Sequence, residues 1–262
     1  MQKRSWFLLA GSFGAAILGV LLRWYQLTRV YDPVTAMPRT GSLASLTLSL
    51  LLIAFIIFLF LLLRCINKSL TAEQLEKLVV GRTILTPLLC ALLGVTVCVS
   101  GILMLRAIYS FPFPNLRQIV ALFVIAAGIG ITVMGFLTKT PEKSIACPMF
   151  ILPVACFCIY LIVFYKEVQN DPVVWNYAVQ ILAISVNALS FFHLAGFVFH
   201  RPRPLHAVFF CLLAFSVSIA CLADDLILSE TLLFVAMALV NLLFAVNILE
   251  NIDRCSAAPV NE

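Results

Sequence analysis

Polar side chains that could bind a ligand are concentrated in one strongly apolar segment, NYAVQILAISVNALSFFH, which covers residues 176–193. Successive residues of an α-helix are turned by about 100°, so four of these side chains fall within an arc of about 80° and form one stripe. They are Asn176, Gln180, Asn187 and Ser190. Asn241 lies near the middle of a second apolar segment. Amides and hydroxyls both donate and accept hydrogen bonds, so these five residues predict a site for a neutral solute or a polar lipid head group.

The same residues also have a purely structural interpretation. Amides and hydroxyls inside membrane helices bond to one another across helix interfaces, and such bonds average only about 0.6 kcal/mol. We expect Asn187 and Asn241 to lie at similar depth, and Asn187 to face the interior, because an amide without a partner in hydrocarbon is costly. The sequence favours bonding between helices but leaves the ligand site open as an alternative.

Composition indicates that the elements carrying these residues are membrane-spanning helices. Hydrophobic residues make up 63% of the 262 residues and charged residues 11%, whereas soluble domains usually carry about 25% charged residues. The segment 51–63 contains no polar side chain at all. We therefore predict an all-α, polytopic transmembrane helix bundle without a soluble domain.

Eight segments approach the roughly 20 residues that a bilayer requires, and we assign them to a single transmembrane domain covering residues 1–262. The first is predicted to be an uncleaved helix, because no signal-peptide cleavage site follows it. A short surface helix is expected at 71–80, between the second and third spans. Asp-Pro-Val occurs at 32–34 and again at 171–173, which suggests a weak four-plus-four repeat. The predicted spans are 6–22, 43–63, 83–105, 119–137, 146–165, 173–199, 207–223 and 231–249.

The Lys and Arg residues predict the orientation of the chain. Eleven of them fall in the segments on the side of the two termini and six on the opposite side, so the positive-inside rule places both termini in the cytoplasm. The net charge of +5 reflects this topology, and we expect no nucleic-acid partner.

Proton relays and voltage sensors place ionisable groups inside the membrane, and the predicted spans have none near their centres. The chain also lacks a His-Glu-x-x-His or Gly-x-Ser-x-Gly motif, and its histidines are predicted to lie on the opposite side from its clustered acids. We therefore expect no catalytic activity, no metal and no cofactor. The charged residues assigned to helix ends include Arg23, Arg106, Asp224, Asp225 and Glu230.

Two further features suggest contacts with lipid and with protein. Arg201 and Arg203, in the predicted cytoplasmic turn HRPRPLH, could contact anionic lipid head groups or serve only as topological anchors. Small residues recur at four-residue spacing, which lets membrane helices approach closely, either within the bundle or against another membrane protein. These are Gly11, Ala15 and Gly19; Cys90, Gly94 and Cys98; and Ala126 and Gly130.

The eight spans, with Arg23, Gln26 and Asp32-Pro33-Val34-Thr35 after the first of them, resemble uncharacterised multi-pass membrane proteins of Gram-positive anaerobic bacteria. The resemblance implies a bacterial plasma membrane and carries no activity with it. Our leading hypothesis is a non-enzymatic auxiliary or regulatory membrane component that acts through helix contacts. The alternative is a transporter or binder of a small neutral solute or a lipid, and an intramembrane enzyme ranks third.

Overall fold

The computed structural model describes residues 3–29, 43–64, 85–108, 116–137, 143–169, 174–199 and 201–257. These residues form eight α-helices and a short 3-10 helix, η2, with no strand among them. All eight α-helices are long and apolar enough to cross a membrane, so the predicted all-α polytopic bundle is confirmed. The predicted surface helix at 71–80 and both Asp-Pro-Val triplets lie outside the described residues. The elements are α1 (Lys3–Arg29), α2 (Leu43–Arg64), α4 (Leu85–Ile108), α5 (Leu116–Leu137), α6 (Lys143–Val168), η2 (Val174–Tyr177), α7 (Ala178–Val198), α8 (Pro204–Cys221) and α9 (Leu228–Ala257).

Helix α1 is longer than the span predicted from hydropathy. The predicted span stops at Leu22 because Arg23 ends the apolar run, yet the helix continues to Arg29. Its 27 residues extend about 40 Å at 1.5 Å per residue, which exceeds the roughly 30 Å of a hydrocarbon core. The last turns of α1 therefore remain helical while they carry polar side chains.

Six helices form a closed ring. Each of α4, α5, α6, α7 and α8 contacts the next helix along the chain, and α9 also contacts α4. The interior is filled by side chains rather than left as a pore, because large residues from several of these helices are completely buried. They include Ile131, Met134, Phe157, Phe191, Phe234 and Phe244.

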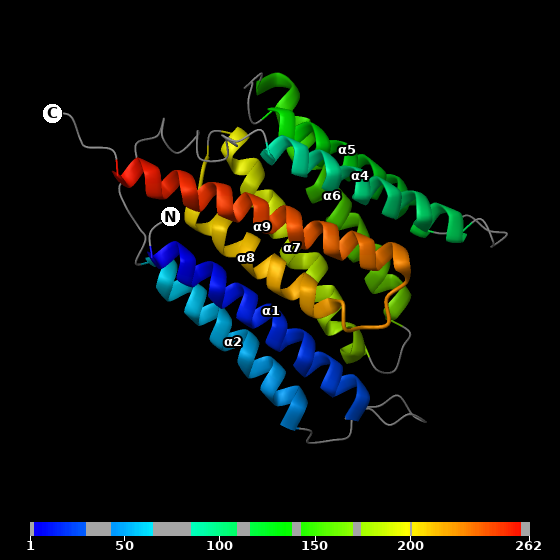
Figure 1. Ribbon diagram of the computed structural model, residues 1–262. Helices are drawn as coiled ribbons and strands as arrows, with labels where there is room; N and C mark the ends of the chain where they lie inside the picture. Colours follow the sequence, from blue (N-terminus) through cyan, green and yellow to red (C-terminus); the bar gives the residue numbers. More distant parts are fainter. Residues whose placement is uncertain are drawn as a thin grey trace.

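Helices α1 and α2 stand outside this ring (Figure 1). Helix α1 packs along α8, whereas α2 contacts mainly α1 and reaches α8 only to a small extent. Helix α2 is the least buried of the eight spans, and α8 and α9 are the most buried. The pair is thus attached to the ring chiefly through α1.

The two ends of the described chain lie at the same end of the bundle (Figure 1). The Ser5 hydroxyl near the start of α1 donates a hydrogen bond of 2.8 Å to the Asp253 carboxylate near the end of α9. Both side chains are buried. An even number of spans requires this arrangement.

The predicted small-residue faces are used for packing inside the chain. A Cβ atom added to Gly94 on α4 would lie 2.2 Å from Thr132 Oγ1 and 2.6 Å from the Gly128 carbonyl oxygen on α5. One added to Gly11 on α1 would lie 2.4 Å from the ring of Phe58 on α2. The approach at Gly94 requires glycine because its neighbours include the α5 backbone, whereas at Gly11 the neighbour is a side chain. In both places small residues let neighbouring helices of this protein pack closely.

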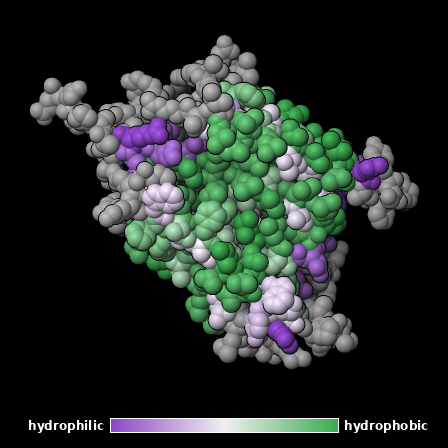
Figure 2. All heavy atoms as spheres, in the orientation of Figure 1, coloured by the Kyte–Doolittle hydropathy of each residue, from purple (hydrophilic) through white to green (hydrophobic). Residues whose placement is uncertain are grey.

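The outer surface is suited to lipid. Figure 2 shows hydrophobic residues over the middle of the molecule and hydrophilic residues near its ends. Helices α2 and α4 expose large apolar side chains, among them Ile53, Ile57, Leu88 and Leu92. In a membrane these side chains contact the hydrocarbon of the bilayer.

Replacing Gly94 with alanine should destabilise the protein, because the new methyl group would overlap the α5 backbone. Overpacking of this kind costs about 1–3 kcal/mol, and the loss should appear as a lower free energy of unfolding in detergent micelles. Gly14→Ala is the matched control, since nothing lies within 4 Å of a Cβ atom at Gly14. Equal effects of the two substitutions would contradict the close approach of α4 and α5.

Candidate functional site

The deepest polar group of the interior joins three helices. Asn187 on α7 donates from Nδ2 to Ser218 Oγ on α8 and to the Ala183 carbonyl oxygen, both at 2.8 Å. Asn241 on α9 donates from Nδ2 to Asn187 Oδ1 at 2.8 Å and to the Met237 carbonyl oxygen at 2.9 Å. The side chains of Asn187, Asn241 and Ser218 are completely buried. The expectation that Asn187 faces the interior, level with Asn241, is confirmed.

This amide network aligns helices more than it stabilises them. Asn241 Oδ1 is buried and accepts no hydrogen bond from the described residues. An unsatisfied buried acceptor costs about 1–3 kcal/mol, which offsets what a bond between membrane helices contributes. Ser190 is also buried, and its hydroxyl bonds to the Asn187 carbonyl oxygen at 2.8 Å. The deep polar atoms therefore fix how α7, α8 and α9 face one another.

A second polar cluster surrounds Arg23, six residues before the end of α1. Its Nε donates to Asp224 Oδ1 at 2.6 Å, and Asp224 lies in the turn between α8 and α9. One Nη donates to Gln26 Oε1 at 2.9 Å, and the other donates to the backbone oxygen of Asn176 in η2. One guanidinium thus connects α1 with the α8–α9 turn and with the start of α7.

Both residues of this ion pair are buried, although they lie near helix ends as the sequence predicts. Arg23 and Asp224 are only 2% and 9% exposed. Burial raises the pKa of the Asp224 carboxyl above its ordinary value, while the charge of Arg23 and hydrogen bonds from Arg23 and Gln180 act in the opposite direction. Asp224 therefore depends on Arg23 to remain charged in this position.

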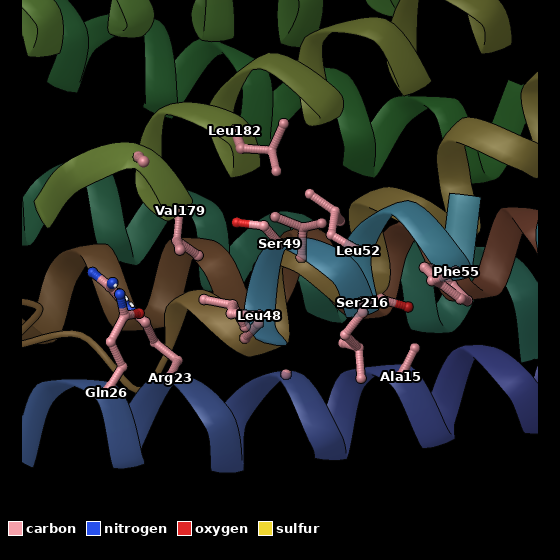
Figure 3. Close-up of a pocket in the computed structure, with 15 residues that line it drawn as sticks. Ala15, Arg23, Gln26, Leu48, Ser49, Leu52, Phe55, Val179, Leu182 and Ser216 are labelled. Atoms are coloured by element: carbon pink, nitrogen blue, oxygen red, sulfur yellow. Dashed lines mark hydrogen bonds between the residues drawn. The ribbon is translucent and has the colours of Figure 1, made fainter. Parts of the chain in front are cut away.

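A cavity of about 250 Å³ lies next to the ion pair, between the α1–α2 pair and helices α7 and α8. Arg23 and Gln26 reach from α1 toward α7 at one end of it, and Phe55 on α2 lies at the other end (Figure 3). Every lining residue belongs to one of the eight spans, and most of them are apolar. The apolar wall of the cavity includes Ala15, Gly19, Leu52, Val179 and Leu182.

Sequence reasoning missed this site. Arg23 and Gln26 are three residues apart and so share one helix face, but the predicted span ends at Leu22, which left Arg23 at a helix end and Gln26 in a loop. Their partner Asp224 is 201 positions away from Arg23, and no local pattern indicates that pairing. The residues of the apolar wall are of the same types as ordinary packing residues.

The structure divides the predicted ligand residues into two groups. Asn187, Ser190 and Asn241 meet in the deep network. Asn176 and Gln180 lie at the Arg23–Asp224 cluster, through the backbone oxygen of Asn176 and the side chain of Gln180. None of the five lines the lateral cavity, and their role in ligand binding stays a prediction.

A third polar group lies where α5, α6 and α9 come together. Arg117 Nε donates to Glu167 Oε1 at 2.7 Å, and Arg117 Nη1 is 3.9 Å from Glu230 Oε1. Arg117 is 44% exposed, so these ion pairs contribute little stability beyond orienting the helix ends. Within the described ranges, no three His, Cys, Asp or Glu side chains are placed to hold a metal ion.

The basic turn before α8 lies at the opposite end of α8 from Asp224. Arg201 and Arg203 are exposed, and the Arg201 amide donates to the Gly196 carbonyl oxygen at 2.9 Å. Nearby, the His193 ring stacks on Phe210 with 4.9 Å between centroids. Both arginines are placed where lipid head groups can reach them, and their contact with anionic lipid stays a prediction.

No family model matches the chain, and comparisons with curated proteins and with solved structures likewise give no match. Eight membrane-spanning helices around a packed interior nevertheless define its class. The chain is a multi-pass integral membrane protein.

Asn187→Leu should lower the free energy of unfolding by only about 1 kcal/mol, because bonds between membrane helices are weak. The double variant Asn187→Leu/Asn241→Leu should lose less than the sum of the two single losses, since the two amides bond to each other. Unfolding by denaturing detergent in mixed micelles measures all three variants. Strictly additive losses would contradict the direct bond.

Arg23→Leu should be much more damaging, because it leaves the Asp224 carboxylate buried without its cation. Breaking a buried ion pair costs about 3–5 kcal/mol, and Arg23→Leu/Asp224→Leu should recover most of that loss. Arg29→Leu, at an exposed position on the same helix, serves as the control and should have little effect. If Arg23→Leu is tolerated as well as the control, the pair does not anchor α1.

Proposed function

We propose that this integral membrane protein is a non-enzymatic auxiliary or regulatory component that binds one hydrocarbon chain of an amphipathic lipid. The observation that carries the proposal is the mostly apolar cavity within the spans, which has a buried polar cluster at one end. An amphipathic lipid likewise combines an apolar chain with a polar head group. Lipid binding, the alternative that the sequence left open, thus moves from the predicted stripe to this lateral cavity.

The size and the apolar lining of the cavity suit one hydrocarbon chain of a lipid. Its volume of about 250 Å³ equals roughly eight groups the size of a water molecule, at about 30 Å³ each. Apolar cavities exclude water, and the surrounding bilayer supplies hydrocarbon. A single acyl or alkyl segment fits this space better than a hydrated solute does.

The interior argues against passage of a polar solute along the predicted stripe. Asn187 and Asn241 bond to each other and to the backbones of their own helices. Large apolar residues such as Phe191 and Phe234 are completely buried around them. A transport path would have to break these contacts, so binding from the bilayer side is favoured over transport.

The proposal also includes the orientation of the chain in the membrane and its lipid and protein partners. The excess of Lys and Arg on the side of the termini supports cytoplasmic termini, and the family resemblance supports a bacterial plasma membrane. The Arg23–Asp224 cluster then lies toward the outer leaflet, and Arg201 and Arg203 face anionic lipid in the inner leaflet. A membrane-protein partner would contact the exposed faces of α2 and α4, because the small-residue faces are occupied within the chain.

Native mass spectrometry of the protein in mild detergent tests the proposal. The wild type should retain one lipid, which fragmentation then identifies. Ala15→Trp should fill the cavity and weaken retention at least about tenfold, since Ala15 lines its wall. Ala10→Trp is the matched control on an exposed part of α1 and should retain the lipid. Absence of bound lipid in the wild type, or equal retention by both variants, would refute the site.

A further inference from the structure

We infer that the head group held at the polar end of this cavity is uncharged, and that the ligand is a neutral glyceride, in which an ester joins an acyl chain to glycerol. This inference rests on the proposed function and adds the class of lipid. It follows from the charge, the hydrogen-bonding capacity and the depth of the cluster formed by Arg23, Gln26, Gln180 and Asp224, which we call the head-group cluster.

The head-group cluster has no net charge to offer a ligand. Arg23 is positive, but the Asp224 carboxylate lies 2.6 Å from its Nε and cancels that charge. Asp225, the next residue, is exposed and adds negative charge nearby. A phosphate or carboxylate head group would gain attraction from Arg23 and lose a comparable amount to repulsion from Asp224, whereas water and salt screen the charge of the exposed Asp225. A cationic head group would meet a carboxylate that Arg23 already occupies.

The head-group cluster has N–H donors to spare, which favours a ligand group that accepts hydrogen bonds. A guanidinium has five N–H groups and no acceptor. The bonds to Asp224, Gln26 and the backbone of Asn176 use three of them, which leaves two N–H groups. Because Arg23 lines the cavity wall, an ester carbonyl or a hydroxyl oxygen at this end can accept from it without bringing in charge.

The depth of Arg23 matches the position of an ester. Arg23 lies six residues, about 9 Å, before the end of α1, in the last turns of a helix that is longer than the hydrocarbon core. Lipid esters occupy the same boundary between chains and head groups. From Arg23 to Ala15 the cavity wall follows eight residues of α1, about 12 Å, which receives the first part of an acyl chain.

Two probes with the same chain and different heads test the inference. Titration of the wild type with 1-oleoylglycerol and with oleoyl lysophosphatidic acid, followed by native mass spectrometry, should show at least about tenfold tighter binding of the glyceride. Asp224→Asn removes the charge that cancels Arg23, so it should shift the preference toward the anionic probe at least about tenfold. Asp225→Asn is the matched control at an exposed position and should shift the preference far less.

Each outcome separates the head-group inference from the proposed function. If the wild type prefers the anionic probe, or if the two asparagine variants shift the preference equally, the inference is overturned. The cavity itself still stands in that case, provided that Ala15→Trp abolishes binding of both probes. If neither probe binds, the proposed function fails as well. Copurification of a lipid without an ester, such as a polyprenol, would overturn the glyceride assignment, and if Asp224→Asn does not accumulate, the wild-type comparison decides.

Discussion

Buried polar groups need partners wherever water is excluded, and the attachment of α1 to the ring depends on how this chain meets that constraint at Arg23 and Asp224. A buried guanidinium requires a carboxylate and further acceptors. The chain supplies them from the α8–α9 turn, from α1 itself and from η2. Helix α1 is thus fixed at one end by this pair and at the other by the bond between Ser5 and Asp253. The cavity lies where helices α1 and α2 face α7 and α8.

Two of the polar groups of the bundle differ in what lies beside them. The deep amides on α7 and α9 bond to each other and close the interior. The cluster near the end of α1 lies next to a mostly apolar cavity whose walls are membrane spans. The lipid that we propose as its ligand would enter from the bilayer and would need no hydrated path across the membrane.

The sequence was sufficient to predict the fold class and part of the interior. Apolar run lengths predicted the eight spans, and helical spacing together with the cost of an unpaired amide predicted that Asn187 faces inward. The same hydropathy criterion ended the first span at Leu22 and so left Arg23 outside it. Hydropathy indicates which residues contact lipid, but it does not show where a helix ends. The Arg23–Asp224 pair could not be predicted, since it depends on how distant helices dock. The cavity also depends on how the helices dock: Ala15 and Gly19 are of the same types as packing residues, and only the assembled helices show that they line a cavity.

The central claim is that one lipid chain enters between α2 and α7 and places an uncharged head at Arg23. A cryo-electron microscopy map of the protein in nanodiscs of its native lipids, at a resolution that shows acyl chains, tests it most directly. A bound lipid chain should appear as elongated density between Leu52 and Leu182 that ends at the guanidinium of Arg23, with Asn187 and Asn241 still bonded in a dry interior. A map in which α2 closes against α7 without any density between them, or in which Asn187 lines a water-filled passage, would contradict this claim.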